Sequence, residues 1–578
     1  MKPQAVDVVP WRRRLVLGLV ALVVLGLGAR AFFLQAYERA FLQSEADARH
    51  LRRVPLQAHR GAILDRSGEP LAVSTPVDSV WVDPKALFAS GGTDGRPSAR
   101  EQIARLARAL GRDARALYQT LDARAQRRFV YVARHLPPER AAQVRALGVT
   151  GVYLQREYRR YYPSAEITAH VLGFTDIEDR GQEGLELAYD RWLRGIPGEK
   201  RVLRDRRGRV VADVAQVRAP QPGRDLTLSI DQRIQYLAYR ALKRGVQRVG
   251  ARGGSLVVID PRTGEVLAMV NQPSFNPNNP ADRRPGRTRN RAVTDVFEPG
   301  STVKPFTIAA ALASGRYDPD HVVDTSPGWW RISRHTIRDM HDYGPCSLGR
   351  ILVKSSNIGA AKLALELPPE QLWGIFHQVG FGSGTDSGFP GEATGVLRDF
   401  QDWRRVEQAT LAFGYGLSVT ALQLARAYAV LATDGLLVPA TFLRTDEPPT
   451  AERVLPARVA RQVRRMLEGV VGAEGTAPRA AVTGYRVAGK TGTVHKSEAG
   501  GYAAKRYLAL FAGMVPASRP ALVAVVVIDE PVPKQHFGGQ AAAPVFAEVM
   551  AGALRLLNVP PDAVEHLQAG RATREGPA

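Results

Sequence analysis

The pattern of apolar and polar residues begins with a segment that fits a membrane better than a soluble core. Three arginines, Arg12–Arg14, precede an apolar run over 15–34 that only Arg30 interrupts. About 20 apolar residues are enough for a helix to cross a bilayer. Arg12–Arg14 should stay cytoplasmic by the positive-inside rule, and Arg30 can extend its side chain to the far interface. The pattern predicts a cytoplasmic tail over 1–14 and a transmembrane anchor over 15–34.

A cleaved signal peptide is the alternative interpretation of this segment. Ala29-Arg30-Ala31 loosely fits a small-x-small cleavage site after an apolar core. The arginine between the alanines and the apolar aromatic residues that follow favour retention. No second apolar run of about 18 residues follows. We therefore expect a single-pass anchor, with the bulk of the chain exported.

The region from 40 to 220 is rich in arginine and has short apolar stretches separated by turn-like sequences. This pattern predicts an elongated mixed module with short strands and few long helices. Helical composition over 99–121 predicts an inserted lobe. The cluster Pro220-Gln221-Pro222-Gly223 marks a domain boundary.

The region from 223 to 557 has strand patterns at both ends and helical patterns between them. A helix is expected from Gln232 to about Val249, then a hairpin of 255–259 and 265–270 around Asp260–Gly264. Strand-like runs return at 507–515 and 521–528, and alanine-rich helical stretches, including 307–313, 358–367 and 421–433, lie between. Pairing of strands from both ends into one antiparallel sheet predicts an α+β domain, followed by a flexible tail over 558–578.

Composition and charge narrow the function classes. A chain of 578 residues is too long for one hydrophobic core. Its formal charge of +23 suits a nucleic-acid binder, an anionic membrane surface or an acidic polymer. No zinc-finger spacing or aromatic ribonucleoprotein motif is present, so we expect no nucleic-acid partner. The single cysteine, Cys346, and the spacings of His335, His341 and His495 match no metal site, and no cofactor is expected.

The strongest local sign of chemistry is Ser301, three residues before Lys304. Pro305 lacks an N–H and is tolerated only in the first turn of a helix, so a helix should begin close to Ser301. Residues three apart share one helical face, which brings the Lys304 amine within reach of the Ser301 hydroxyl. This pair is a candidate nucleophile and base if burial and a second cation lower the pKa of Lys304.

Two later motifs strengthen this interpretation. Ser355-Ser356-Asn357 follows, and Lys490-Thr491-Gly492-Thr493 comes at the end of a strand-like stretch. Each of these short motifs, taken alone, occurs often by chance in a long chain. The ordered set S-x-x-K, S-x-N and K-T-G is typical of penicillin-binding proteins and class A β-lactamases.

Along nearly its whole length the chain resembles the class B penicillin-binding proteins, the peptidoglycan D,D-transpeptidases of bacteria. The resemblance rests on the three motifs and on further segments in both regions. These are Arg60–Gly68, Arg160–Pro163, Gly181–Glu186, Asn290–Gly300, Gly414–Gly416, Glu474–Ala477 and Gly538–Gly539. The sequence of Val296–Gly300 is more similar to that of the division-specific members than to that of the elongation-specific ones. The family implies a pedestal over 40–220 and a transpeptidase domain over 223–557, with helices on both faces of its antiparallel sheet.

The resemblance implies a role for each motif residue. Ser301 would attack the carbonyl between two terminal D-alanines, Lys304 would accept its proton, and Ser355 would relay a proton to the leaving group. Asn357 would hold the substrate amide, and Lys490 would supply positive potential. Among substrate-binding residues, Thr493 would bind the terminal carboxylate and share an oxyanion hole with Ser301, while Thr491 and Gly492 would shape the strand. A side chain at Gly492 is expected to crowd the substrate.

The resemblance also implies partners and a location. Peptidoglycan stem peptides would be the substrates, and β-lactams would be inhibitors. The partners would be a multi-pass glycosyltransferase and other division proteins. The chain would lie in the bacterial inner membrane, with its catalytic domain in the periplasm. A β-lactamase is disfavoured because no Glu-x-x-x-Asn lies between the second and third motifs. A bifunctional class A protein would need a glycosyltransferase domain before the pedestal. An elongation-specific role and a noncatalytic scaffold of the division complex stay as alternatives.

Overall fold

The N-terminal part of the chain forms one long apolar helix. A computed structural model describes residues 10–36, 51–90, 97–204, 210–447, 449–498 and 501–563. Helix α1 (Pro10–Ala36) has a stretch of mean hydropathy 2.3, none of it buried, and is long enough to cross a bilayer. It contains the predicted anchor over 15–34. Most of the predicted cytoplasmic tail, residues 1–9, lies outside the described residues.

The chain divides into two compact units, each assembled from segments that are separated in the sequence. Unit 1 comprises 1–59, 76–158 and 195–222, and unit 2 comprises 60–75, 159–194 and 223–578. The segments 60–75 and 159–194, which the sequence analysis assigned to the pedestal, therefore cluster with the C-terminal region. Their hydrogen bonds explain this placement, since Asn278 accepts from Tyr162 N and Gln235 donates to Ile167 O.

Unit 1 is built from short antiparallel strands and small helices. Its strands include β1 (Leu51–Leu56), β6 (Gly198–Arg204) and β7 (Val210–Arg218), paired in the order β1-β6-β7, and β4 (Val130–Leu136), which pairs with part of β3 (Pro70–Val82). Its helices are α3 (Pro84–Ser90), α4 (Ala99–Leu110), α5 (Ala114–Asp122) and α6 (Pro138–Ala146). The helical stretch predicted over 99–121 is two helices, because Gly111 ends α4 in the left-handed conformation and Asp113 caps α5.

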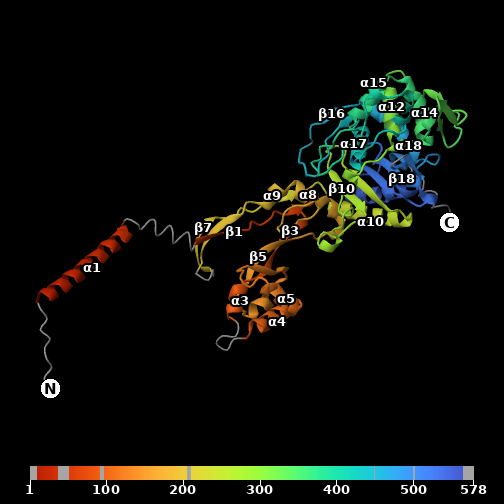
Figure 1. The fold of residues 1–578 in the computed structure, drawn as a ribbon. Coiled ribbons are helices and arrows are strands. Elements are labelled where there is room, and N and C mark those ends of the chain that lie inside the picture. The colour runs from red at the N-terminus through yellow and green to blue at the C-terminus, as the bar shows by residue number, and fades with distance from the viewer. Residues whose placement is uncertain are drawn as a thin grey trace. The chain divides into compact units, whose positions relative to one another are not determined.

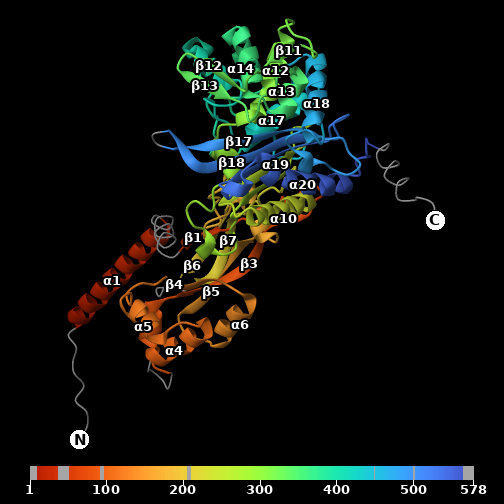
Figure 2. The same cartoon turned by 90° about the vertical axis from the view of Figure 1, so that its right-hand side faces the viewer.

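Unit 2 is organised around a five-stranded antiparallel sheet of order β10-β9-β19-β18-β17 (Figures 1 and 2). Its strands are β9 (Gly253–Ile259), β10 (Val266–Gln272), β17 (Ala488–Glu498), β18 (Gly501–Val515) and β19 (Leu522–Asp529). Strands β9 and β19 pair directly, for example Val257 with Val525. The predicted pairing of strands from both ends of the region is confirmed, as is the hairpin around Asp260–Gly264.

Helices cover both faces of this sheet, as predicted. Helices α10 (Gln232–Arg248) and α20 (Ala543–Leu556) pack on one face, and α17 (Ala421–Ala432) packs on the other (Figure 2). The helices on the α17 side of the sheet include α12 (Lys304–Ala313), α13 (Leu348–Lys354), α14 (Asn357–Glu366) and α18 (Ala457–Val471) (Figure 2). Helix α15 (Pro369–Gln378) contacts α12, and α16 (Arg405–Leu411) contacts α14. All twelve residues of α17 are buried, so this helix is the core between the sheet and the helices on this side.

Short elements complete the two units. The short strands are β2 (Ile63–Leu64), β8 (Leu226–Thr227), β11 (Val322–Asp324), β12 (Trp329–Ile332), β13 (His335–Arg338), β14 (Pro345–Ser347), β15 (Leu436–Leu437) and β16 (Glu452–Arg453), and β5 is Val152–Tyr161. The short helices are α7 (Ala169–Leu172), α8 (Gly184–Ala188), α9 (Asp190–Arg194), α11 (Arg291–Thr294) and α19 (Gly538–Ala541). The 3-10 turns are η1 (Ala165–Ile167), η2 (Pro280–Asp282), η3 (Gly300–Val303), η4 (Phe400–Asp402), η5 (Pro478–Ala480) and η6 (Pro533–Gln535).

The segment after α20 is tied to the domain. Asp562 accepts hydrogen bonds from Arg486 N at 2.7 Å and from Ser518 Oγ at 2.6 Å, and Tyr485 donates to Val559 O. The prediction of a flexible tail from residue 558 is therefore wrong for its start, because these long-range contacts hold it. Residues 564–578 lie outside the described residues.

A buried ion cluster joins three of the segments that carry the family resemblance. Glu186 binds Arg60 at 2.7 Å and Arg160 at 2.6 Å, and all three side chains are at most 1% exposed. Arg60 also binds Asp190 at 2.8 Å, and Arg160 Nη1 donates to Gly61 O. Arginine stays charged in proteins, so each buried guanidinium depends on its carboxylate partner.

This cluster predicts a large stability loss in Glu186→Ala. Two buried guanidinium groups would lose their shared partner, and we expect the free energy of unfolding to fall by about 3–5 kcal/mol. Denaturant unfolding of the detergent-solubilised chain, followed by tryptophan fluorescence, measures this loss. The control is Glu548→Ala, which breaks a more exposed ion pair with Arg244 and should cost about 0–1 kcal/mol. Equal, small losses in both variants would contradict the analysis.

Candidate active site

Ser301 lies on a 3-10 turn that leads directly into an α-helix. Turn η3 holds Ser301, and α12 begins at Lys304 with Pro305 in its first turn. Lys304 Nζ lies 3.0 Å from Ser301 Oγ. The predicted contact between residues three apart is therefore confirmed.

Close backbone packing fixes the residue before Ser301. Gly300 has a φ of +52°, and a Cβ there would lie 2.3 Å from Val494 Cγ1 on β17. On its other side Gly300 N donates to Gly414 O at 3.1 Å, and a Cβ at Gly414 would lie 2.1 Å from Gly300 O. Only glycine fits between these neighbours. The turn that presents Ser301 is thus held between β17 and the segment after α16.

Lys304 is fully buried among oxygen atoms of three residues from two segments of the chain. Besides Ser301 Oγ, its Nζ lies 2.5 Å from Ser355 O, 3.3 Å from Ser355 Oγ and 2.8 Å from Asn357 Oδ1. An ammonium has three protons for these four oxygens. A neutral Nζ can instead donate to two of them and accept the proton of the Ser301 hydroxyl. The arrangement is therefore that of a base beside a nucleophile.

Ser355 bridges this lysine and a second one. Lys490 Nζ, also fully buried, donates to Ser355 Oγ at 2.9 Å. Ser355 has a φ of +61°, in the left-handed region that non-glycine residues rarely adopt. This conformation, at the junction of α13 and α14, places the carbonyl oxygen within reach of Lys304 and the hydroxyl within reach of both lysines.

The pKa values of the two lysines are lowered, chiefly by burial. Burial lowers the pKa of Lys304 well below its usual range, the charge of Lys490 lowers it further, and the carboxylate of Asp339 acts in the opposite direction. Burial lowers the pKa of Lys490 to about 7. We expect Lys304 to lose its proton first, because burial and the charge of Lys490 together lower its pKa well below the usual range, whereas the pKa of Lys490 is lowered to about 7. The predicted causes of the Lys304 shift, burial and Lys490, are those found.

The third motif lies on β17, next to the nucleophile turn. Thr493 Oγ1 accepts a hydrogen bond from Gly538 N at 3.1 Å, and the hydroxyls of Thr491 and Thr476 lie 2.8 Å apart. A Cβ at Gly492 would approach Thr302 Cγ2 at 3.0 Å and Leu510 Cβ at 3.1 Å, so tight packing inside the domain is a second reason for glycine at this position. The expected crowding of a substrate by a side chain there stays a prediction.

Asp339 is a site neighbour that the sequence analysis missed. It follows β13, and its carboxylate accepts hydrogen bonds from Ser356 Oγ and from the backbone N–H groups of Asn357 and Ile358. No spacing rule links an aspartate in this loop to a motif more than a dozen residues later. Only the folded contacts identify it.

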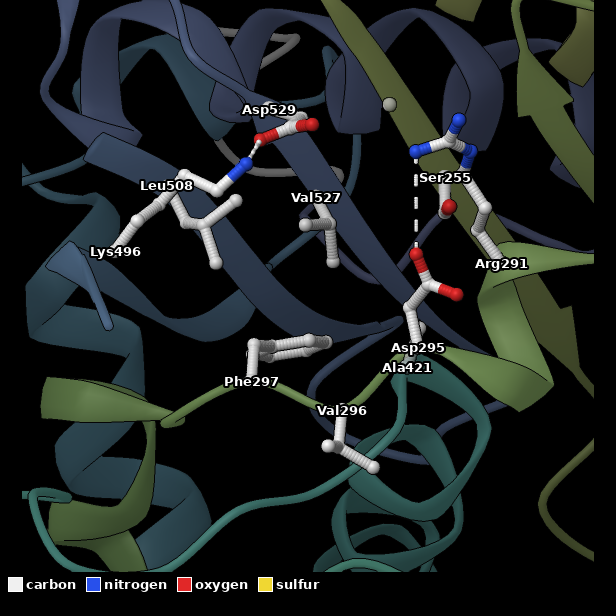
Figure 3. Close-up of a pocket in the computed structure, with 11 residues that line it drawn as sticks. Ser255, Arg291, Asp295, Val296, Phe297, Ala421, Lys496, Leu508, Val527 and Asp529 are labelled. Carbon is white, nitrogen blue, oxygen red and sulfur yellow. Dashed lines mark hydrogen bonds and ion pairs between the residues drawn. The ribbon is translucent and has the colours of Figure 1, made fainter. Parts of the chain in front are cut away.

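A separate cavity of about 110 Å³ lies beside the segment that leads to Ser301 (Figure 3). Val296 and Phe297 line it together with the ion pairs Lys496–Asp529, at 2.7 Å, and Arg291–Asp295, at 3.9 Å. Among the described residues that line it, none belongs to the three motifs. Its charged groups are already paired, so the cavity is a neighbour of the lysine cluster and not part of it.

Comparisons with families of known proteins match both regions of the chain. Residues 254–551 match the family described as penicillin binding protein transpeptidase domain, and 55–228 match the penicillin-binding protein dimerisation domain. The Pseudomonas aeruginosa protein named probable peptidoglycan D,D-transpeptidase PbpC is 43% identical over 552 residues, 96% of each chain. The Escherichia coli peptidoglycan D,D-transpeptidase FtsI is 42% identical over 556 residues, 96% of this chain and 93% of that protein.

Solved structures show the same likeness. The transpeptidase domain of Burkholderia pseudomallei penicillin-binding protein 3 is 46% identical with a TM-score of 0.54, and the match covers 58% of this chain and 97% of that one. A peptidoglycan synthetase from Bifidobacterium adolescentis is 26% identical with a TM-score of 0.70, over 89% and 98% of the two chains.

Proposed function

The chain belongs to the class B penicillin-binding proteins, and from this premise we propose that it is a D,D-transpeptidase that cross-links peptidoglycan stem peptides of the septal cell wall. The observation that carries the proposal is the 3.0 Å contact between Ser301 Oγ and the buried Nζ of Lys304. Similarity to FtsI and the sequence Val296–Gly300 support the septal role.

Acylation begins with proton transfer from Ser301 to Lys304. The Ser301 oxygen attacks the carbonyl carbon between the two terminal D-alanines, and the neutral Lys304 amine takes the hydroxyl proton. Collapse of the tetrahedral intermediate breaks the peptide bond and expels D-alanine, whose nitrogen needs a proton. Ser355, within 3.3 Å of Lys304 and 2.9 Å of Lys490, is placed to relay it.

Residues of β17 and Asn357 bind the substrate. Thr493 Oγ1 already accepts from Gly538 N, which leaves its own proton for the terminal carboxylate of the substrate. Lys490 adds positive potential there. The backbone N–H groups of Ser301 and Thr493 form the oxyanion hole, an arrangement in which one donor typically contributes about 10² to 10³ in rate. Asn357 Nδ2 holds the substrate amide, and Thr491, fixed by Thr476, and Gly492 keep the strand in place.

The second half-reaction transfers the acyl group to an amine of another stem peptide. The amine attacks the ester carbonyl, the Ser301 oxygen leaves and regains its proton, and a cross-link replaces the original peptide bond. A β-lactam would be attacked in the same way and would block the site. The chain would depend on a multi-pass glycosyltransferase partner for glycan strands. A noncatalytic scaffold would not need the buried and fully assembled lysine cluster.

The chain is a single-pass inner membrane protein, and we propose its orientation. Arg12–Arg14 would hold the N-terminus in the cytoplasm, and residues after 34 would lie in the periplasm. The pedestal over 40–220 and the transpeptidase domain over 223–557 remain proposals for the functional division of the exported part.

The proposed acyl-enzyme intermediate implies that a penicillin should label one serine covalently. The detergent-solubilised full chain should be labelled covalently by a fluorescent penicillin, and Ser301→Ala should not, because the attacking oxygen is gone. Peptide mass mapping of the adduct measures the site. Ser314→Ala, which changes a serine at the other end of α12, is the matched control and should label normally. An adduct on any residue other than Ser301 would contradict the site assignment.

The two lysines predict a bell-shaped pH profile for the second-order rate of acylation. The rate should rise as Lys304 loses its proton, well below the ordinary lysine pKa of about 10.4. It should fall as Lys490, whose pKa is about 7, loses the charge that attracts the carboxylate. The midpoints belong to the coupled pair. Labelling rates between pH 4 and 10 provide the test.

Variants of the lysines check each limb of this profile. Lys490→Ala should shift the rising limb to higher pH, since repulsion on Lys304 disappears, and should remove the falling limb. Lys304→Ala should abolish acylation. Lys243→Ala on α10 removes a more exposed charge and should leave both limbs unchanged. A Lys490→Ala profile with an unmoved rising midpoint would show that Lys490 acts on the substrate alone.

The orientation predicts protease protection of the N-terminus only. Full-length protein should stay with membranes after carbonate washing, because α1 spans the bilayer. Protease added to the periplasmic face should remove the bulk of the chain and leave a tag before residue 10 intact. A mature N-terminus at Phe32 would show instead that the segment is a cleaved signal peptide.

A further inference from the structure

The hairpin of β12 and β13 has one buried face and one exposed face. Ile332 and Ile337 are buried against Ile358 of α14, and Trp330, the cross-strand partner of Ile337, packs on the same cluster (Figure 2). Side chains alternate between the two faces of a strand, so the residues that alternate with these lie on the opposite face. We call that face the outer face, and its exposed residues are Trp329, Arg331, Thr336 and Arg338.

The outer face borders the catalytic cluster. The carbonyl oxygen of Arg338 accepts a hydrogen bond from Asn357 Nδ2 at 3.0 Å, and Asn357 Oδ1 accepts one from Lys304 Nζ at 2.8 Å. Lys304 Nζ in turn lies 3.0 Å from Ser301 Oγ. One Nδ2 proton of Asn357 is used by Arg338, which leaves the other for a substrate carbonyl. A substrate held at Asn357 would therefore lie next to the end of β13.

The guanidinium groups of the outer face carry charge that the protein does not neutralise. Within the described part of the chain, the Arg338 side chain has no hydrogen-bond or ion-pair partner, and Arg331 Nε donates to a backbone carbonyl of the turn at 3.1 Å. The carboxylates of the same segment are engaged elsewhere. Asp339 binds the first turn of α14, and Asp324 and Asp342 each accept from a backbone N–H two residues on. The outer face can therefore bind an anion.

Trp329 gives the outer face an apolar group as well. Its side chain is 49% exposed and makes no ring or cation contact with any residue that the structure describes. Trp330 differs, because it packs on the buried cluster and Lys362 Nζ lies 5.6 Å from its ring centroid. Trp329 lies directly opposite Arg338 in the strand register. Tryptophan and arginine are enriched at binding hot spots, so an exposed pair of them indicates an interaction surface.

We propose that the outer face binds the stem peptide of the donor strand, with Arg331 and Arg338 at its carboxylates and Trp329 against its apolar atoms. The inference rests on the proposed function and extends it to a substrate-binding surface outside the three motifs. Stem peptides of peptidoglycan carry carboxylate groups upstream of the terminal D-alanines. The guanidinium group suits this task, because it binds a carboxylate through two parallel N–H groups.

Two features favour the donor peptide over the acceptor peptide. Asn357 is the residue that would hold an amide of the donor, and its side chain is bonded to Arg338 itself. The terminal carboxylate of the donor would be bound by Thr493 on β17, which leaves the upstream carboxylates for the two arginines. The outer face should therefore act in the first half-reaction, in which the donor acylates Ser301.

The experiment compares two donors that differ in one charge. Both are D-alanyl thioesters of mercaptoacetic acid, whose carboxylate replaces that of the terminal D-alanine. One carries a free glutamyl carboxylate upstream, and in the other this group is amidated. Thiol release by the full detergent-solubilised chain gives kcat/KM for acylation. We expect the acidic donor to react about threefold faster or more, which is the order that exposed ion pairs supply. In about 1 M salt, where the Debye length is about 3 Å, the preference should largely disappear.

Variants test which residues cause the preference. The double variant Arg331→Gln with Arg338→Gln should react with both donors at equal rates, because it removes the two charges. Trp329→Ala should lower both rates by about threefold or more and keep their ratio, because it removes packing and not charge. The matched control is Arg248→Gln, which removes an exposed arginine from α10 on the other face of the sheet and should keep the ratio. A general loss of folded protein lowers both rates and also leaves the ratio unchanged.

Equal rates for the two donors in the unaltered protein, or an unchanged preference in the double variant, would overturn the inference. It is also overturned if neither donor acylates a protein that fluorescent penicillin still labels at Ser301. A double variant that keeps the donor preference and loses only transfer to an amine acceptor would place the acceptor peptide on this face instead. A protein that neither the donors nor penicillin acylate would overturn the proposed function itself.

Discussion

Two fully buried lysine side chains lie in one cluster, and the site depends on the free-energy cost of burying both amines. Transfer of an isolated ammonium into a low-dielectric interior is so unfavourable that the group loses its proton instead. Lys304 and Lys490 are both fully buried, and Ser355 Oγ contacts both Nζ atoms. Burial and mutual repulsion therefore produce a neutral amine beside Ser301, which is what a base for a serine hydroxyl must be.

The same physical constraint has the opposite outcome at the Arg60 cluster. Arginine does not lose its proton in proteins, so Arg60 and Arg160 need a negative charge beside them when they are buried. Glu186 supplies that charge to both. There the charges persist in a paired network that stabilises unit 2. At the lysine cluster no carboxylate lies in direct contact with either amine among the described hydrogen bonds, and Asp339 acts only through Ser356 and Asn357 and through space. One arrangement supports structure and the other supports proton transfer.

Close backbone approach brings the separate parts of the site together. Three distant parts of the sequence supply the site: the turn that holds Ser301, the start of α14, and β17. Each part is fixed either by close packing that leaves no room for a side chain or by a hydrogen bond. Gly300 packs against Val494 and Gly414, and Gly492 packs against Thr302 and Leu510. The sheet supplies the rigid base for β17, and the hairpin of β12 and β13 supplies that for α14. Preorganisation of this kind keeps the reacting groups within the small tolerances that acyl transfer requires.

The sequence by itself determined the features that depend on neighbours along the chain. Hydropathy predicted the anchor, periodicity predicted α10 and the hairpin of β9 and β10, and the i, i+3 spacing predicted the contact of Ser301 with Lys304, because helix geometry alone sets that distance. The ordered motifs also indicated that Ser355, Asn357 and Lys490 would join them. Only the tertiary structure decided that Asp339 supports Asn357, that Gly492 packs closely against Thr302 and Leu510, that 60–75 and 159–194 cluster with unit 2, and that Asp562 fixes the start of the predicted tail. These features rest on contacts between residues far apart in sequence, and no local pattern of polarity or spacing encodes which distant partner a side chain will meet.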